Sequence, residues 1–189
     1  IRLGIDVASD GGDEFVIAKR HGWHGSIIHH SSGPANEDAT IVSATAKKFI
    51  LEAIAQHEKD GILEPVVVNV DRTGVGWGVD SELRNWAVRE KKRAVIVGVM
   101  VGEKARNDQR FTKQRSEIWW NFRELLANPE VEITLEDDRE LDKLSVIKQL
   151  NGPSYETMPD GRIQVETKKK MSARGAKSPD RADAMLLAF

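Results

Sequence analysis

Acidic residues stand in three short segments that lie far apart in the chain, each where a buried strand should end or a helix should begin. The first segment, Gly4-Ile5-Asp6-Val7, contains Asp6, and the second is an apolar run that ends in Asp71. The third, close to the C-terminus, contains Asp180 and Asp183. Carboxylates placed in this way can converge on a pair of divalent metal ions, and such pairs catalyse phosphodiester cleavage. We therefore expect metal-assisted phosphodiester chemistry.

Each of these aspartates also has a structural explanation. Asp6 and Asp71 each suit the capping of the turn that follows them, although Asp71 ends the most apolar strand, where open α/β sheets bind ligands. Asp180 and Asp183 share one face of the first turn of the last expected helix, where aspartate is an ordinary capping residue. Asp180 lies near the positive end of that helix, which favours its ionised form. Asp183 has apolar neighbours, so we expect it to face the protein and to need a partner such as a metal ion.

The set of candidate ligands is rich in oxygen and lacks sulfur. The chain has no cysteine, and its five histidines show no metal-ligand spacing. Hard oxygen ligands favour Mg²⁺ or Mn²⁺ over zinc, and we expect two ions, about 3.5–4 Å apart, in one site. In the glycine-rich loop after Asp71, Trp77 is the aromatic residue best placed to touch a substrate, whereas Trp119 and Trp120 suit a core helix.

The elements that position these residues follow from periodicity and turn signals. Strands are expected over residues 2–7, 14–20, 24–29, 66–70 and 94–99, with a hairpin over 154–157 and 162–167. Helices are expected from a cap at Asn36, Glu37 or Asp38 to Lys59, and over 79–90, 112–127 and 139–150. A last helix is expected with Ser178 as its cap and Pro179 in its first position.

This order of elements predicts an α/β fold in which an antiparallel meander is followed by parallel strands in one mixed sheet flanked by helices. The ribonuclease H-like fold is an arrangement of this kind, and the strand order is inferred by that analogy. At 189 residues the chain suits one domain over residues 1–189.

The composition excludes a protein that spans a membrane with an apolar helix. Charged residues make up 31% of the chain, and no apolar run approaches the roughly 20 residues that span a bilayer. Acidic residues gather between residues 130 and 142, and basic ones between 162 and 181. The basic stretch leads into the last acidic pair and would attract a phosphate backbone, although charge runs are commonly solvated faces.

The closing stretch contains Val165-Glu166-Thr167-Lys168, Met171, Arg174-Gly175 and Lys177-Ser178-Pro179-Asp180-Arg181-Ala182-Asp183-Ala184. This stretch resembles the nuclease domain of the large terminase subunit of tailed bacteriophages. Gly4-x-Asp6, the strand ending in Asp71 before Thr73-Gly74-x-Gly76, and Arg115-Ser116-Glu117-Ile118-Trp119 extend the resemblance over essentially the whole chain.

The resemblance implies a metal-dependent endonuclease that cuts concatemeric double-stranded viral DNA during genome packaging, with little sequence specificity. Asp6, Asp71 and Asp183 would be the catalytic, metal-binding carboxylates, with Asp180 as an additional or alternative ligand and Asp10 or Asp13 in an outer shell. Lys168, Lys169, Arg174 and Lys177 would face the DNA backbone.

The same resemblance carries expectations about the whole protein. The chain begins at Ile1 rather than Met, in a strand-like segment, so we expect it to be the C-terminal part of a longer protein whose N-terminal ATPase domain is absent. The expected partners of that protein are the portal and the small terminase subunit, and no membrane. The expected location is the host cytoplasm, transiently at the procapsid.

Three other interpretations fit parts of the sequence. A Holliday-junction-type resolvase would share the fold and prefer four-way junctions. A DNA-binding or motor-docking module would use the carboxylates for structure alone. Gly4-x-Asp6 also opens actin-like ATPases and sugar kinases, but the phosphate loops that these need are missing.

Overall fold

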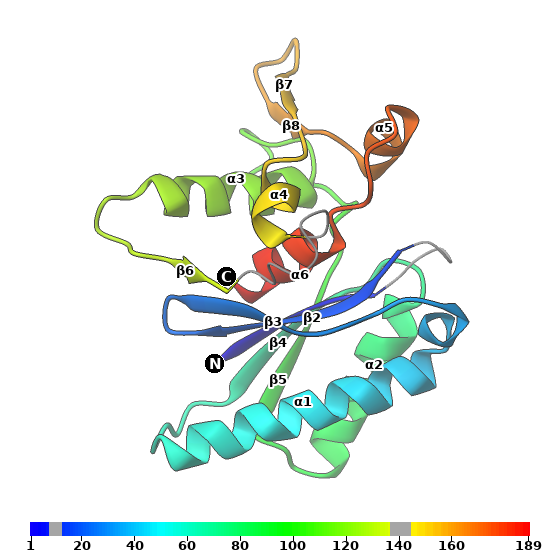
Figure 1. Ribbon diagram of the computed structural model, residues 1–189, viewed down its shortest axis with the longest axis vertical. Helices are drawn as coiled ribbons and strands as arrows, with labels where there is room; N and C mark the ends of the chain where they lie inside the picture. Colours follow the sequence, from blue (N-terminus) through cyan, green and yellow to red (C-terminus); the bar gives the residue numbers. More distant parts are fainter. Residues whose placement is uncertain (8–12, 137–144) are drawn as a thin grey trace.

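The structure, a computed structural model, describes residues 1–7, 13–136 and 145–189. A single large sheet carries helices on both faces, and a small hairpin projects from the far side of one helical layer (Figure 1). In the described part of the chain, no helix combines the length and apolar character that crossing a membrane requires.

The large sheet is mixed and has the strand order β5-β4-β1-β2-β3-β6. Its strands are β1 (Arg2–Asp6), β2 (Phe15–His21), β3 (His24–Ser31), β4 (Val66–Asp71), β5 (Ala94–Val99) and β6 (Thr134–Leu135). The first three pair antiparallel as a meander, and β4 pairs parallel with both β1 and β5. The short β6 adds to β3 in parallel, and β7 (Tyr155–Thr157) and β8 (Ile163–Val165) form the separate hairpin.

The helices divide between the two faces of the sheet (Figure 1). They are η1 (Pro34–Glu37), α1 (Ala39–Lys59), α2 (Gly76–Arg89), α3 (Gln114–Ala127), α4 (Val146–Leu150), α5 (Lys168–Ala173) and α6 (Asp180–Ala188). α1 and α2 cover one face, where strand residues such as Leu3, Ile5 and Val68 pack against them in the largest apolar cluster. α6 covers the other face and is itself covered by α3 and α4.

α6 lies unusually close to β1 because β1 carries a glycine there. A Cβ added at Gly4 would lie 2.0 Å from the backbone oxygen of Ala184, so no side chain fits between strand and helix. Asn69 on β4 secures the same contact by donating a hydrogen bond of 2.6 Å from its side-chain amide to the carbonyl of Leu187. Side chains alternate along a strand, so Asp6 faces α6 together with Gly4. The Gly-x-Asp motif thus brings the closing helix onto the first catalytic candidate.

Most of the expected elements are present, with shifted ends. The meander, the parallel pairs and the cap are confirmed: the carboxylate of Asp38 accepts hydrogen bonds from the backbone of α1. The helix expected over 79–90 begins earlier, at Gly76, and the one expected over 112–127 begins at Gln114. The helix expected over 139–150 spans Val146–Leu150 in the described part, and residues 139–144 lie outside the described residues.

Two expectations near the C-terminus are wrong. The strand expected over 162–167 ends at Val165, because Thr167 caps α5 by accepting a hydrogen bond from the backbone of Lys170. α6 begins at Asp180 with Pro179 as its cap residue, one position later than expected. The Ser178 hydroxyl bonds the carboxylate of Asp180 and does not cap the helix backbone.

Candidate metal centre

Asp6 and Asp71 lie side by side at the same edge of the sheet. Ile5 pairs with Val70 in the parallel β1–β4 ladder, so the aspartates that follow them end neighbouring strands. Strands in a sheet are about 4.8 Å apart, and residues in register share a face. Asp71 is also held locally, because one of its oxygens accepts hydrogen bonds from the backbone amide (2.9 Å) and hydroxyl (2.7 Å) of Thr73. The turn-capping and ligand interpretations of Asp71 are therefore compatible.

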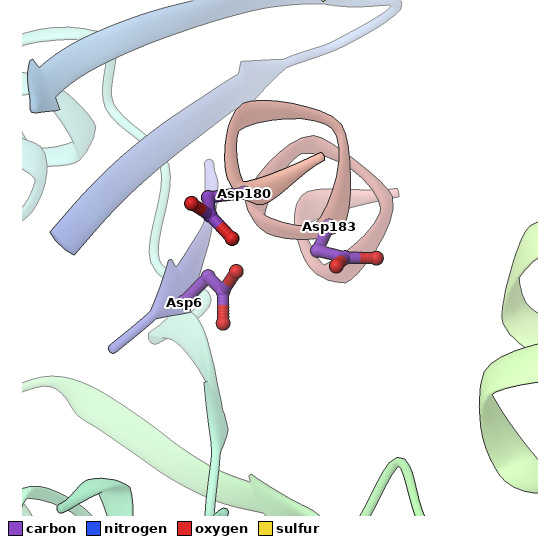
Figure 2. Close-up of side chains that lie close together, drawn as sticks. All are labelled: Asp6, Asp180 and Asp183. Carbon is purple, nitrogen blue, oxygen red and sulfur yellow. The ribbon is translucent and has the colours of Figure 1, made fainter. Parts of the chain in front are cut away.

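The first turn of α6 brings two more carboxylates to this edge. Asp6, Asp180 and Asp183 each offer an oxygen, and these oxygens lie within 4.8 Å of one another. Figure 2 shows the carboxylates of Asp6 and Asp180 pointing toward one another from the strand and the helix. All three residues are at least nine-tenths buried. Three of the four sequence-predicted carboxylates thus lie together in the fold, and the fourth, Asp71, ends the strand next to Asp6.

The ammonium group of Lys168 lies among these carboxylates. Its Nζ is 3.0 Å from an oxygen of Asp180, 3.3 Å from one of Asp183 and 3.4 Å from one of Asp6. Burial lowers the pKa of Lys168, but the neighbouring carboxylates outweigh this and raise it above its usual value. Lys168 is therefore protonated and supplies a positive charge at the position that a bound metal ion would share.

Asp183 is held from the side by α3. Arg115 donates from Nη1 to both oxygens of Asp183, at 2.6 and 2.8 Å, and the indole N–H of Trp119 donates to one of them at 2.9 Å. Burial opposes the ionisation of Asp183, but Arg115 and Lys168 outweigh it, and its pKa is lowered. The α3 helix thus fixes Asp183 as a carboxylate.

Asp180 is positioned by the start of β2. The backbone amide of Glu14 donates to Asp180 at 3.0 Å, and the Glu14 carboxylate binds the fully buried guanidinium of Arg181 at 2.9 and 3.2 Å. Because Arg181 follows Asp180 in α6, this buried pair joins the first turn of the helix to the sheet. Asp180 is therefore held in the carboxylate cluster by contacts outside its own helix, which helix capping alone does not explain.

The electrostatics of the site favour a bound cation. Burial raises the pKa of Asp6 well above its usual value, and the charges of the other carboxylates add to this effect while Lys168 opposes it. Burial also raises the pKa of Asp71, against the hydrogen bonds from Thr73. Such shifts mean that the ionised carboxylates lack enough positive charge around them.

The net charge of the site also favours a bound cation. Among the described side chains, Asp6, Asp71, Asp180 and Asp183 face two cations, Lys168 and Arg115. Two negative charges are left, so the site attracts divalent cations. The ligand atoms are hard oxygens, so this site fits Mg²⁺ or Mn²⁺.

The basic residues expected to face DNA lie in different surroundings. Lys168 points into the carboxylate cluster, whereas Lys169 and Lys177 are exposed. Arg174 binds Glu166 at 2.9 Å and the carbonyl of Gly152 at 2.8 Å, so it also joins the segments around α5. Contact of these residues with DNA stays a prediction. Asp10, an expected outer-shell carboxylate, lies outside the described residues.

Sequence reasoning missed the residues that support the carboxylates. Arg115 appeared only as part of a resemblance, and Trp119 was expected to serve the core. Trp119 does pack in an apolar cluster, but its N–H reaches Asp183. The spacing of Arg115 and Trp119, four residues apart, was an available signal, because it places both on one helix face.

Comparisons with known proteins agree with this architecture. No family model and no curated protein matches the chain. The nuclease domain of the large terminase subunit gp2 of bacterial virus Sf6 superposes with a TM-score of 0.69 at 17% identity, over 99% of this chain and 86% of that one. A point variant of that domain with manganese and beta-thujaplicinol gives a TM-score of 0.68 at 17% identity, over the same shares of the two chains. A variant with calcium gives 0.66 at 16%, again over 99% and 86%.

This likeness establishes the fold. The chain has the ribonuclease H-like fold of the terminase nuclease domain, as the order of its expected elements predicted.

Proposed function

We propose that this protein is a divalent-metal-dependent endonuclease that hydrolyses phosphodiester bonds of double-stranded DNA. The observation that carries the proposal is the convergence of Asp6, Asp180 and Asp183 at one edge of a ribonuclease H-like sheet, with Asp71 ending the strand next to Asp6. A purely structural role accounts poorly for this cluster, because burying mutually repelling carboxylates costs free energy that folding must offset elsewhere. A terminase nuclease fold adds support, since the structures that it resembles include complexes with manganese and calcium.

The proposed ligands are Asp6, Asp71, Asp180 and Asp183. Asp6 is central, because its pKa is influenced by all three of the others. Asp71 and Asp183 line one small cavity with Arg115, on the α3 side, whereas Asp180 lies toward the start of β2. These four carboxylates would hold the pair of divalent ions that we propose. Two bound Mg²⁺ or Mn²⁺ ions would supply an activated water and stabilise the leaving oxygen of the cut strand.

The protein's own residues have distinct tasks in this proposal. The sheet edge and the first turn of α6 orient the ligand oxygens, and Arg115 with Trp119 keeps Asp183 ionised and fixed. Lys168 stabilises the carboxylates without metal, and at the ordinary pKa of a lysine it would stay protonated if a bound ion moved it aside. A protonated amine next to the reacting centre would then attract a phosphate oxygen.

The biological setting that we propose is viral genome packaging, in which the domain cuts concatemeric DNA with little sequence preference. The full protein would carry an ATPase domain before this one and would act with the portal and the small terminase subunit. It would work in the host cytoplasm, transiently at the procapsid.

The test is digestion of supercoiled plasmid in Mn²⁺, Mg²⁺ or EDTA by the wild type and by Asp6→Asn. We expect nicking and linearisation that require metal and that Asp6→Asn abolishes. Asp60→Asn is the matched control, because Asp60 lies 3.7 Å from His21, at the opposite end of the sheet. Cleavage by Asp6→Asn at the wild-type rate would contradict the proposal. A strong preference for four-way junctions over linear duplex would favour the resolvase, and DNA binding without cutting would favour the docking module.

A further inference from the structure

A cation–π pair lies on the other face of the sheet, directly after Asp71. Along β4, Val66, Val68 and Val70 pack against α1 and α2, whereas Asp71 belongs to the α6 face. The next side chain, Arg72, points to the α2 side, where its guanidinium lies 3.7 Å from the ring centre of Trp77. Arg72 and Trp77 therefore flank the edge that carries the carboxylates.

The side chain of Arg72 is held in place by an acidic partner on α2 and by the space above a glycine on β5. Its Nε forms an ion pair with a carboxylate oxygen of Asp80, 3.1 Å away. Asp80 is almost fully buried and accepts a 2.8 Å hydrogen bond from Arg84. Gly98 on β5 leaves room for the Arg72 side chain, because a Cβ there would lie 2.0 Å from its Cδ. Any larger residue at position 98 would displace the guanidinium. The side chain is thus fixed before any ligand arrives.

Trp77 presents a large aromatic surface to solvent at this place. The residue is 53% exposed although its ring stacks on Arg72. A guanidinium has five N–H donors, so pairing with Asp80 through Nε does not exhaust those of Arg72. A fixed guanidinium next to an exposed indole offers one group for a phosphate and one for a sugar or a base.

We propose that Arg72 and Trp77 bind the DNA strand beside the phosphodiester that is cut. Arg72 contacts a neighbouring phosphate, and the exposed face of Trp77 packs on a deoxyribose or on an unstacked base. This inference rests on the proposed function, because it takes DNA as the substrate of the carboxylate centre. It assigns the residues that align the strand, and neither of them touches the reacting atoms.

The chain contains a matched control for the alternative, in which a cation–π pair merely stabilises a turn. The guanidinium of Arg20 lies 4.5 Å from the ring centre of Trp23, a residue that is 43% exposed. This pair sits at the β2–β3 turn, and Arg20 is opposite Arg2 at the end of β1 far from Asp6. Trp23→Ala therefore removes the same chemistry from a place distant from the proposed centre.

The test compares Trp77→Ala with Trp23→Ala on a fluorescein-labelled duplex of 30 base pairs. Binding is measured by anisotropy in EDTA, and KM and kcat are measured for cleavage in Mn²⁺. We expect Trp77→Ala to weaken binding and raise KM about tenfold, within the range for loss of one stacking aromatic, with kcat changed less than twofold. Trp77→Phe should restore most of the affinity, and Trp23→Ala should match the wild type. Arg72→Met should lower the salt dependence of binding by about one phosphate contact.

Each outcome decides the inference. Unchanged KM and affinity in Trp77→Ala would overturn it, as would an equal loss in Trp23→Ala. Trp77 is exposed, so its variants should melt within a few degrees of the wild type, and this is checked first. If the wild type cuts DNA and Trp77→Ala has the same affinity and KM, only this inference is contradicted. A wild type that neither binds nor cuts DNA in any metal contradicts the proposed function as well.

Discussion

Replacing Lys168 by methionine should make the stability of the protein depend on divalent metal. The Nζ atom lies 3.0–3.4 Å from oxygens of three carboxylates. At an effective dielectric constant of about 20, each such pair attracts by roughly 5 kcal/mol before desolvation is counted. Removing one partner of a buried ion pair costs about 3–5 kcal/mol. The Lys168 side chain is 35% exposed, so solvent screening lowers the expected loss to about 2–3 kcal/mol.

The assay is thermal unfolding in EDTA and in Mn²⁺. A loss of about 2–3 kcal/mol corresponds to a fall in Tm of roughly 4–12 °C for a chain of this length. Metal at a hundredfold excess over its Kd stabilises by about 2.7 kcal/mol, and Lys168→Met should gain more because no ammonium competes for the carboxylates. The gap between variant and wild type should therefore close in Mn²⁺. Lys169→Met, an exposed neighbour in α5, is the matched control and should melt with the wild type in both solutions.

Two results would contradict this prediction. A Tm gap of the same size in EDTA and in Mn²⁺ would mean that Lys168 and the metal do not share a site. A Lys168→Met variant as stable as the wild type without metal would mean that the carboxylates do not repel one another strongly.

Three further predictions concern the support of the site. Asp183→Asn should destabilise the protein by about 3 kcal/mol in chemical denaturation, because it leaves the Arg115 guanidinium buried without its charge partner; an unchanged midpoint would contradict this. Gly4→Ala should lower the Tm by at least about 6 °C, because its methyl group would meet a backbone oxygen of α6 at 2.0 Å; a wild-type Tm would show that the helix can shift freely. Arg174 lowers the pKa of Glu166 to about 2, so the stability from this pair is present above pH 4.5 and is lost as the pH falls toward 2. As the pH falls from 4.5 toward 2, the Tm of Glu166→Gln should therefore fall less than the Tm of the wild type. Parallel curves of Tm against pH for the two proteins would contradict this prediction.

The sequence predicted those parts of the site that depend on local patterns. The valine run indicated a buried strand ending in Asp71, and the Gly4-x-Asp6 strand and the closing helix were equally visible. Parallel strands place their carboxyl ends at one edge, so the neighbourhood of Asp6 and Asp71 followed from the fold class. These elements are long or strongly apolar, and their periodicity is decisive.

The remaining features depend on contacts between distant segments. β6 has two residues and forms because it pairs with β3, so no local sequence pattern predicts it. The position of Lys168 follows from where the six-residue α5 begins, which a Thr167 cap decides. The contacts of Arg115 and Glu14 with α6 result from packing across 68 and 167 residues of chain. Such contacts carry no periodic signal.

The most direct test of the metal centre is a crystal structure of the protein soaked in Mn²⁺, with the anomalous signal of manganese measured. We expect Mn²⁺ bound by Asp6 and at least one of Asp71, Asp180 and Asp183, with Lys168 Nζ moved away from the carboxylates. Manganese bound elsewhere, or Lys168 still bridging the three carboxylates in a crystal saturated with the ion, would contradict it.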